Sequence, residues 1–170
     1  IDSEGIVTRF AGNPGVPGSD DGTFGSGSFN YPAGMTIDAS GNLYIAGNFN
    51  GSIRKIDVVG NVTTFAGSSN SHGYANGNRL SARFNHPYDI KIDPTTGNLF
   101  ITDNFNNAIR KIDMTTNIVS TIAGVPGVSG FVDGYGSIAT FNDPFCLTVA
   151  DDGTIYVSDT GNHTIRKIVP

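Results

Sequence analysis

The stretch FNYPAGMTIDASGNLYIAGNFNGSIRKI at residues 29–56 decides the fold, because it returns twice along the chain. The second copy is FNHPYDIKIDPTTGNLFITDNFNNAIRKI at 84–112, and the third is FNDPFCLTVADDGTIYVSDTGNHTIRKI at 141–168. Each copy opens on Phe-Asn-X-Pro and closes on Ile-Arg-Lys-Ile. Ahead of each copy stand an Ala-Gly pair and then an Asp-Gly or Asn-Gly pair. Four landmarks in one order, three times over, define an internal repeat.

Each copy predicts short antiparallel strands separated by Gly-, Asn- and Asp-rich turn signals. The predicted strands are 33–38, 42–47, 52–57 and 61–66, then 88–93, 98–102, 108–113 and 117–123, then 145–150, 154–158 and 164–169. Residues 6–11 (IVTRFA) match the fourth strand of a unit. With 23 Gly and 8 Pro in 170 residues, the composition favours the same turn-rich, all-β class.

The isoleucines of the repeated tetrapeptide indicate how the sheets are arranged. Ile53 and Ile56 are three residues apart, so on a strand they point to opposite faces. A sheet that is apolar on both faces needs a neighbour on each side, which the radially stacked blades of a β-propeller provide. We expect Arg54 and Lys55, and their repeats, to pack their stems on the sheet and extend their charged heads into water.

These residues and motifs resemble the NHL-repeat family of β-propellers, in its long, bacterial secreted form. The resemblance implies an all-β propeller of four-stranded antiparallel blades, with three blades' worth present in one segment, 1–170. Its parts are a blade-closing strand at 6–11, repeat one at 29–67, repeat two at 84–124 and repeat three at 141–169. The second-strand Asp of the family's D-x-x-N pattern is Gly47 in the first repeat but Asp103 and Asp159 in the others.

Three blades cannot close a ring, since propellers typically have four to eight. Three interpretations follow: half of a six-bladed ring in a longer protein, two copies that each donate a first strand to the other's last blade, or head-to-tail filament assembly. In each of them the open third strand of the last repeat must be covered, because an exposed edge invites pairing.

Charge and composition narrow the function classes. The net charge of −5 disfavours nucleic-acid binding, which needs Lys and Arg to neutralise phosphates. No apolar run reaches the roughly 20 residues of a membrane span, and none near Ile1 is typical of a signal peptide. Abundant Asn and a single Glu suggest an extracellular or cell-surface chain. Cys146, the one cysteine, is expected to be a small buried residue.

The candidate polar sites favour structural roles. Asp103 with Asn106, and Asp159 with Asn162, are expected to hydrogen-bond the turns in which they lie. Asp38 and Asp93 are expected to begin the turns after first strands, with a cation site as the alternative.

Metal and catalytic sites are not predicted. The carboxylates at 20–21, 133 and 151–152 lack the spacing of a calcium loop, so no cofactor is expected, with calcium as the alternative. His72, His86 and His163 are the only imidazoles, and zinc takes three or four ligands at recognisable spacing. His72 and His86 flank one connection and could meet.

Two further sets of residues are candidates for surface roles. Three N-glycosylation sequons begin at Asn50, Asn61 and Asn162, of which Asn61 is the best placed. The Gly/Ser-rich connections between repeats carry four aromatic residues suited to a protein or carbohydrate partner, unless they tuck between blades: Phe24, Tyr74, Phe131 and Tyr135.

The sequence therefore predicts a non-enzymatic scaffold or interaction module that binds a protein or glycan partner or builds an assembly, by self-association or with further blades of the same polypeptide. The alternative is half of a propeller enzyme, a metal-dependent lyase or hydrolase, whose catalytic groups lie partly in other blades.

Overall fold

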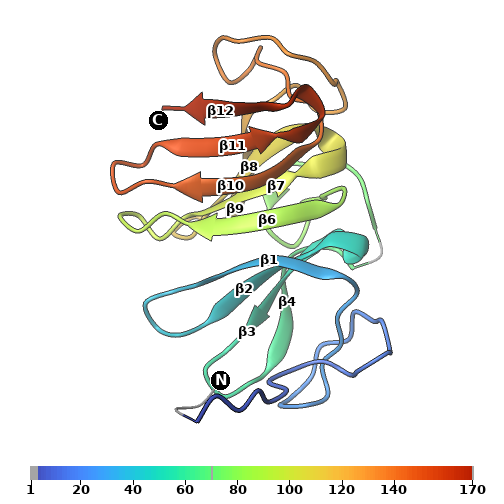
Figure 1. Ribbon diagram of the computed structural model, residues 1–170. Helices are drawn as coiled ribbons and strands as arrows, with labels where there is room; N and C mark the ends of the chain where they lie inside the picture. Colours follow the sequence, from blue (N-terminus) through green and yellow to red (C-terminus); the bar gives the residue numbers. More distant parts are fainter. Residues whose placement is uncertain (1–3, 70, 170) are drawn as a thin grey trace.

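The chain is all-β, with its strands in three antiparallel sheets stacked one on another like neighbouring propeller blades (Figure 1). The computed structural model describes residues 4–69 and 71–169. Within those residues no helix has the length and apolar character needed to cross a membrane. Three single-turn 3-10 helices, η1 (Asn48–Asn50), η2 (Asn104–Asn106) and η3 (Thr160–Asn162), link the second and third strands of each repeat.

The first sheet has the strand order β1-β2-β3-β4. Its strands are β1 (Pro32–Ile37), β2 (Leu43–Gly47), β3 (Ser52–Ile56) and β4 (Val62–Gly67). Consecutive strands pair because their connecting turns are short, as the sequence predicts. The register pairs Leu43 with Ile56 and Ala46 with Ile53. A β-bulge follows Pro32, and the same irregularity follows the first-strand proline of both later repeats.

The second and third sheets repeat this meander. The second has one additional strand, β5, and the third has three strands in place of four. The second has the order β5-β9-β8-β7-β6, and the third has β10-β11-β12. Their strands are β5 (Gly77–Asn78), β6 (Pro87–Ile92), β7 (Leu99–Asp103), β8 (Ala108–Asp113), β9 (Ile118–Ala123), β10 (Pro144–Val149), β11 (Ile155–Asp159) and β12 (Thr164–Ile168). The two-residue β5 lies in a long connection and pairs with β9, which the sequence pattern did not predict.

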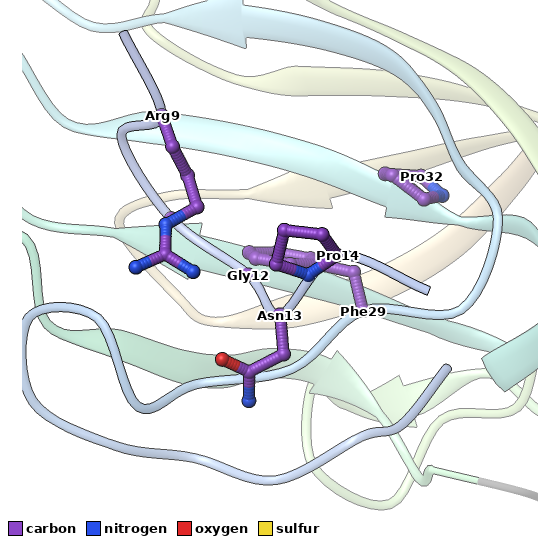
Figure 2. Close-up of a pocket in the computed structure, with 7 residues that line it drawn as sticks. Arg9, Gly12, Asn13, Pro14, Phe29 and Pro32 are labelled. Atoms are coloured by element: carbon purple, nitrogen blue, oxygen red, sulfur yellow. The ribbon is translucent and has the colours of Figure 1, made fainter. Parts of the chain in front are cut away.

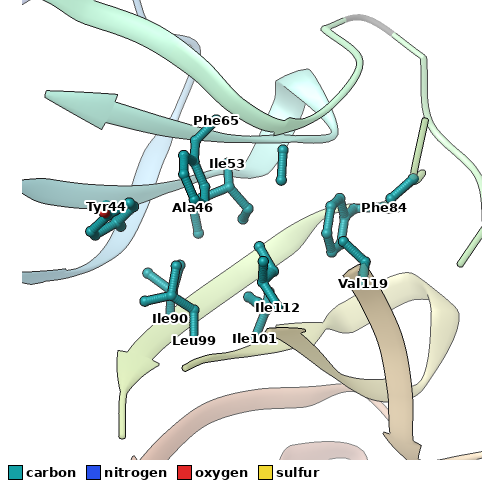
Figure 3. Close-up of a cluster of buried hydrophobic side chains, with 12 residues drawn as sticks. Tyr44, Ala46, Ile53, Phe65, Phe84, Ile90, Leu99, Ile101, Ile112 and Val119 are labelled. Carbon is teal, nitrogen blue, oxygen red and sulfur yellow. The ribbon is translucent and has the colours of Figure 1, made fainter. Parts of the chain in front are cut away.

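The main apolar core lies between the first two sheets (Figure 3). Tyr44, Ile53 and Phe65 from the first sheet meet Ile90 and Ile112 from the second. A second cluster joins the next pair of sheets in the same way, through residues such as Phe100 and Ile109 on one side and Leu147 and Val157 on the other. Ile56, by contrast, packs with Ile45 and Val62 on the opposite face of the first sheet. The two isoleucines of the tetrapeptide therefore do face opposite sides.

Polar contacts along the inner strands join the sheets as well. Asp89 on β6 accepts a hydrogen bond from the backbone N–H of Leu147 on β10, at 3.0 Å. Thr102 donates its hydroxyl to the Phe145 carbonyl oxygen at 2.8 Å. The position of Asp89 is Gly34 in the first repeat, where a Cβ would collide with the Asp89 carboxylate and backbone. Only glycine therefore fits at Gly34 while β1 and β6 keep this separation.

The arginines of the tetrapeptide do not extend into water, and that expectation is wrong. Arg54 and Arg110 are fully buried and Arg166 is nearly so, whereas Lys55 and Lys111 are half-buried and Lys167 is exposed. A guanidinium can be buried when its N–H groups are satisfied, and these three are held by the long connections between repeats.

Arg110 illustrates the arrangement, which we call the arginine clamp. Its Nη2 donates to the Ala75 carbonyl oxygen at 2.8 Å and to Asn76 Oδ1 at 2.9 Å, and its Nη1 donates to the Arg83 carbonyl oxygen at 3.0 Å. The equivalents of Asn76 are Asp21, 2.9 Å from Arg54, and Asp133, 2.7 Å from Arg166. The Asp-Gly or Asn-Gly landmark of each repeat thus fastens the connection to its sheet.

Residues 6–11 form no strand in this chain. Val7 and Phe10 are exposed, and the segment runs along the open side of the first sheet, with Ala11 packed near Ile45 and Ile56. That the segment closes a blade stays a prediction, because a blade lacking its fourth strand is needed to test it.

Candidate interaction surfaces

The outward face of the third sheet is apolar and uncovered. Ile165 on β12 is 71% exposed, although Ile53 and Ile109 at the same repeat position are completely buried. Tyr156 on β11 is 39% exposed, while its equivalent Tyr44 is 2% exposed. A shallow apolar groove runs over this face, lined by Cys146, Leu147, Thr148, Tyr156, Val157, Ser158 and Ile165. In the described residues β12 pairs only with β11, so its other edge is open. We call this surface the forward face.

At the opposite end of the stack, the outward side of the first sheet is also not covered by another sheet of the described residues. We call this surface the rear face. Met35 on β1 is 54% exposed, whereas its equivalents Ile90 and Leu147 are buried by the preceding sheet. An apolar hollow there is lined by Phe10, Ala11, Phe29, Pro32, Met35, Leu43, Ile45 and Ile56. Figure 2 shows an adjoining hollow in which Arg9, Asn13 and Pro14 lie around Phe29 and Pro32.

The turn carboxylates serve the arginine clamp. Asp103 is fully buried, and its Oδ2 accepts hydrogen bonds from Arg110 Nη1 at 2.6 Å and from Asn106 Nδ2 at 2.8 Å. Its Oδ1 accepts the backbone N–H of Asn85 at 2.7 Å. Burial raises the pKa of Asp103 to about 6, and these donors offset part of that rise. They also use its oxygens, so the geometry supports the predicted structural role.

Asp159 and Asn162 repeat this geometry in the third sheet. Asp159 Oδ2 accepts from Asn162 Nδ2 at 2.8 Å and from Arg166 at 2.9 Å. The first repeat departs from it, because Gly47 supplies no carboxylate to Arg54. There, among the described residues, Asn50 Oδ1 and Ser52 Oγ are buried without a hydrogen-bond partner, whereas Arg54 Nε shares this state with Arg110 Nε of the second repeat. This turn is therefore the least satisfied of the three.

Asp38 and Asp93 begin turns, as expected. Asp38 Oδ1 accepts the backbone N–H groups of Ser40 and Asn42 at 2.9 and 2.8 Å. Asp93 Oδ1 accepts the backbone N–H and the hydroxyl of Thr95 at 2.9 and 2.7 Å. Among the described residues no group of three or more His, Cys, Asp or Glu side chains is arranged to hold a metal ion.

Two further turn carboxylates have lowered pKa values. The backbone N–H of Thr116 and that residue's side chain hold the pKa of Asp113 at about 2. The backbone and side-chain amides of Asn61 likewise lower the pKa of Asp57. In both cases hydrogen bonds to the charged carboxylate favour ionisation, so these turns are best satisfied near neutral pH.

The sequon asparagines already use their side-chain amides. Asn50 is 1% exposed and donates to the Gly18 carbonyl oxygen at 2.9 Å. Asn162 is half-buried in its turn, as described above. Asn61 is half-buried and donates to Asp57 Oδ2 at 2.8 Å. Glycan attachment at Asn61 would cost this hydrogen bond, and glycosylation stays a prediction.

Two of the four loop aromatics lie over clamp arginines. The Tyr74 ring is 4.7 Å from the Arg110 guanidinium, and the Tyr74 hydroxyl lies 2.9 Å from that of Thr121. The Phe131 ring is 4.9 Å from the Arg166 guanidinium. Each ring thus contributes a cation–π contact to the fold.

The other two loop aromatics are more exposed. Phe24 makes an edge contact with Phe10, their centroids 6.4 Å apart, and also lies against Gly60. Tyr135 is 84% exposed at the tip of its connection. A partner-binding role for the four loop aromatics stays a prediction.

Cys146 and the histidine pair, His72 and His86, lie outside the apolar core clusters. Cys146 is exposed, so its expected burial is wrong: it lies on the forward face, where no further sheet covers it. His72 and His86 do meet, with their rings stacked at 4.8 Å. They belong to a wider set of rings, including Tyr31, Phe49 and Phe105, that the sequence reasoning missed. The signal was present, since these residues recur at fixed repeat positions before the first strand and in the 3-10 turns.

Comparison with known proteins supports this architecture. Residues 141–168, which form the third sheet, match the family model described as NHL repeat. The third sheet is thus similar to an NHL repeat. The landmarks of that repeat, Phe-Asn-X-Pro and Ile-Arg-Lys-Ile, also stand in the first and second sheets.

The three repeats together align with segments of longer proteins. The chain is 30% identical over 174 residues to the Arabidopsis thaliana protein SUPPRESSOR OF QUENCHING 1, chloroplastic, covering 97% of this chain and 16% of that protein. It is 26% identical to NHL repeat-containing protein 2 of Bos taurus, with 97% and 24% covered. A solved structural genomics protein from Bacteroides thetaiotaomicron has a TM-score of 0.77 at 30% identity, with 84% and 36% covered. The chain thus spans about a quarter or less of these curated relatives.

Proposed function

We infer that the chain is a non-enzymatic NHL-repeat scaffold whose forward face docks against another blade-like sheet. One observation carries the proposal: Ile165 is 71% exposed where Ile53 and Ile109 are completely buried by a following sheet. Burying a side chain of this size is worth about 1.5–3 kcal/mol, so the uncovered face is a strong driving force for association.

The rear face of the same chain is apolar, as a surface that covers the apolar forward face must be. Met35 occupies the position at which Ile90 and Leu147 pack against the sheet before them. A second copy joined head to tail would therefore bring its Met35 surface to Ile165 and Tyr156 of the first. Such a contact is heterologous, and it closes into a ring or continues as a filament according to its rotation.

The isolated 170-residue chain provides a direct test, because in its solution only other copies offer the missing surface. Size-exclusion chromatography with light scattering should give a mass at least twice the 17.8 kDa of one chain. Ile165→Lys should shift the mass to that of one chain, since a lysine head cannot be buried there. Val59→Lys is the matched control, because Val59 is 67% exposed in the β3–β4 turn and should leave the mass unchanged.

A folded wild-type chain that stays at 17.8 kDa up to high concentration would overturn the proposal. Association that survives Ile165→Lys would also overturn it, because some other surface would then be responsible. A dimer and a longer oligomer both support it, and they distinguish the closed from the open arrangement.

A further inference from the structure

A continuous row of aromatic rings crosses the first two sheets at the end that carries the 3-10 turns. Tyr31 and Phe49 have centroids 4.4 Å apart, Phe49 meets His86 edge-on at 4.9 Å, and His86 meets Phe105 at 4.2 Å. The His72 ring stacks on His86 from the connection. Tyr31, Phe49 and Phe105 are 68%, 45% and 59% exposed. We call these five residues the aromatic row.

The repeat itself sets the spacing of the row. Phe49 lies in η1 and Phe105 in η2, where the flanking asparagines are buried and the Phe between them is exposed. Tyr31 and His86 immediately precede the first-strand prolines of the two sheets. The turns that follow β2, β7 and β11 lie on one side of the molecule, on the right of Figure 1. Equivalent positions of two adjacent sheets thus form one surface.

The residues of the row are not the ones that the backbone favours. Tyr31 and His86 have φ values of 49° and 54°, in the left-handed region that bulky residues rarely adopt. The third repeat has Asp143 at this position with φ 58°, and Asp tolerates it well. Tyr31 and His86 therefore stand at positions whose backbone favours smaller polar residues, and both place a ring in the row.

The surface around the row is nearly uncharged. The turn and pre-strand segments 30–31, 48–51, 71–73, 85–86, 104–107, 142–143 and 160–163 contain no Lys or Arg, and Asp143 is their only acidic residue. Burial and the neighbouring His72 lower the pKa of His86, which disfavours a charge on its ring. A phosphate-bearing or strongly charged partner finds no counter-charge here, whereas a neutral partner does not need one.

Free carboxamides accompany the rings. Asn30, Asn85 and Asn142 stand next to Tyr31, His86 and Asp143 in the Phe-Asn-X-Pro motif. Their side chains are half-buried and, within residues 4–69 and 71–169, make no hydrogen bond.

Each of these carboxamides can both donate and accept, as neighbouring sugar hydroxyls do. A run of consecutive prolines, the other ligand suited to aromatic rows, has no backbone N–H, so it presents only carbonyl acceptors and would leave the amide oxygens unused.

We propose that the aromatic row and the three carboxamides form a binding site for a neutral oligosaccharide. The apolar C–H groups of the sugar chain pack on the exposed parts of Tyr31, Phe49 and Phe105, and its hydroxyls exchange hydrogen bonds with the asparagines. The site lies within the described chain and does not depend on the docking of the forward face.

Affinity gel electrophoresis tests the site on the native chain, whose net charge of −5 carries it into the gel. The probes are gels containing hydroxyethylcellulose, xyloglucan, laminarin, arabinoxylan, galactomannan or glycogen, with serum albumin as the mobility reference. At least one gel should retard the chain. Phe49→Ala should weaken the apparent affinity by about tenfold, because it removes the central stacking ring.

Tyr31→Asn separates binding from folding, since Asn suits a positive φ and should leave the melting temperature unchanged while weakening retardation. Tyr135→Ala is the matched control, because Tyr135 is the most exposed of the loop aromatics and lies outside the row. Retardation lost in Tyr135→Ala but kept in Phe49→Ala would overturn the assignment.

Two further results would also overturn it: no retardation in any of the six gels, or binding of a ten-proline peptide to the row in place of the polysaccharides. The mass measurement proposed above is a separate readout, so failure of the scaffold proposal and failure of the sugar site are distinguishable.

Discussion

Replacing Asp103 by alanine tests the arginine clamp at its most buried point. The substitution removes the acceptor of three hydrogen bonds, from Arg110 Nη1, from Asn106 Nδ2 and from the backbone N–H of Asn85. Both charged side chains are fully buried, so water cannot replace the lost carboxylate. The Arg110 guanidinium would stay buried among neutral acceptors with its charge uncompensated.

The expected cost follows from that burial. Breaking a buried ion pair from one side costs about 3–5 kcal/mol, because the remaining charge is left desolvated. For a chain of this length, that loss corresponds to a fall in melting temperature of about 6–20 °C. Urea unfolding at pH 7, followed by circular dichroism, measures the free energy of unfolding directly, and a thermal scan gives the second estimate.

Lys111→Ala is the matched control for this variant. Lys111 lies beside Arg110 on β8 and pairs with Asp113 at 3.3 Å, but both side chains are about one-third exposed. An exposed pair of this kind is worth at most about 1 kcal/mol. If Asp103→Ala costs no more than Lys111→Ala, the clamp does not hold the second sheet to its connection, and the reasoning is refuted.

Three other expectations follow from the same geometry. Gly47→Asp should stabilise the chain by at most about 1.5 kcal/mol in urea unfolding. It supplies Arg54 with the carboxylate that the other repeats have, but its Cβ would lie 2.9 Å from the Ser52 carbonyl oxygen, so the backbone must shift; a loss of stability would contradict this. Gly34→Ala should destabilise it by about 1–3 kcal/mol, because the new methyl group collides with Asp89, and an unchanged melting temperature would show that β1 moves freely. Stability should fall as the pH drops from about 4 to about 2. The pKa of Asp113 is about 2 in the folded state against 3.8 in the unfolded chain, so the stabilising charged form is lost over this range. Asp113→Asn should weaken this pH dependence.

Local patterns predicted the strands within the three repeats to within one residue at each end, although the strand expected at 6–11 did not form and β5 was not predicted. The turn signals at Gly41, Gly60 and Gly153 all have positive φ, so they end strands where the sequence indicates. The alternation of Ile53 and Ile56 also predicted that both faces of a sheet are covered. These features depend on residues that are neighbours along the chain. Three copies of the same pattern therefore suffice to predict where the strands and turns lie.

Contacts between distant residues could not be predicted in this way. The sequence places Arg110 in a strand beside Lys111, but it does not reveal that Ala75 and Asn76 fold back to satisfy the guanidinium. The exposure of Cys146 likewise depends on whether another sheet follows, which no local pattern records.

The repeat determined by itself that this chain forms antiparallel sheets, because strand formation follows from side-chain alternation and turn residues that are neighbours in sequence. Only the tertiary structure decided that Arg54 and Arg110 are buried, that the rings of Tyr31 and Phe105 belong to one surface, and that Ile165 is left uncovered. Each of these depends on segments separated by tens of residues, and the free energy of burial depends on what finally lies against a side chain.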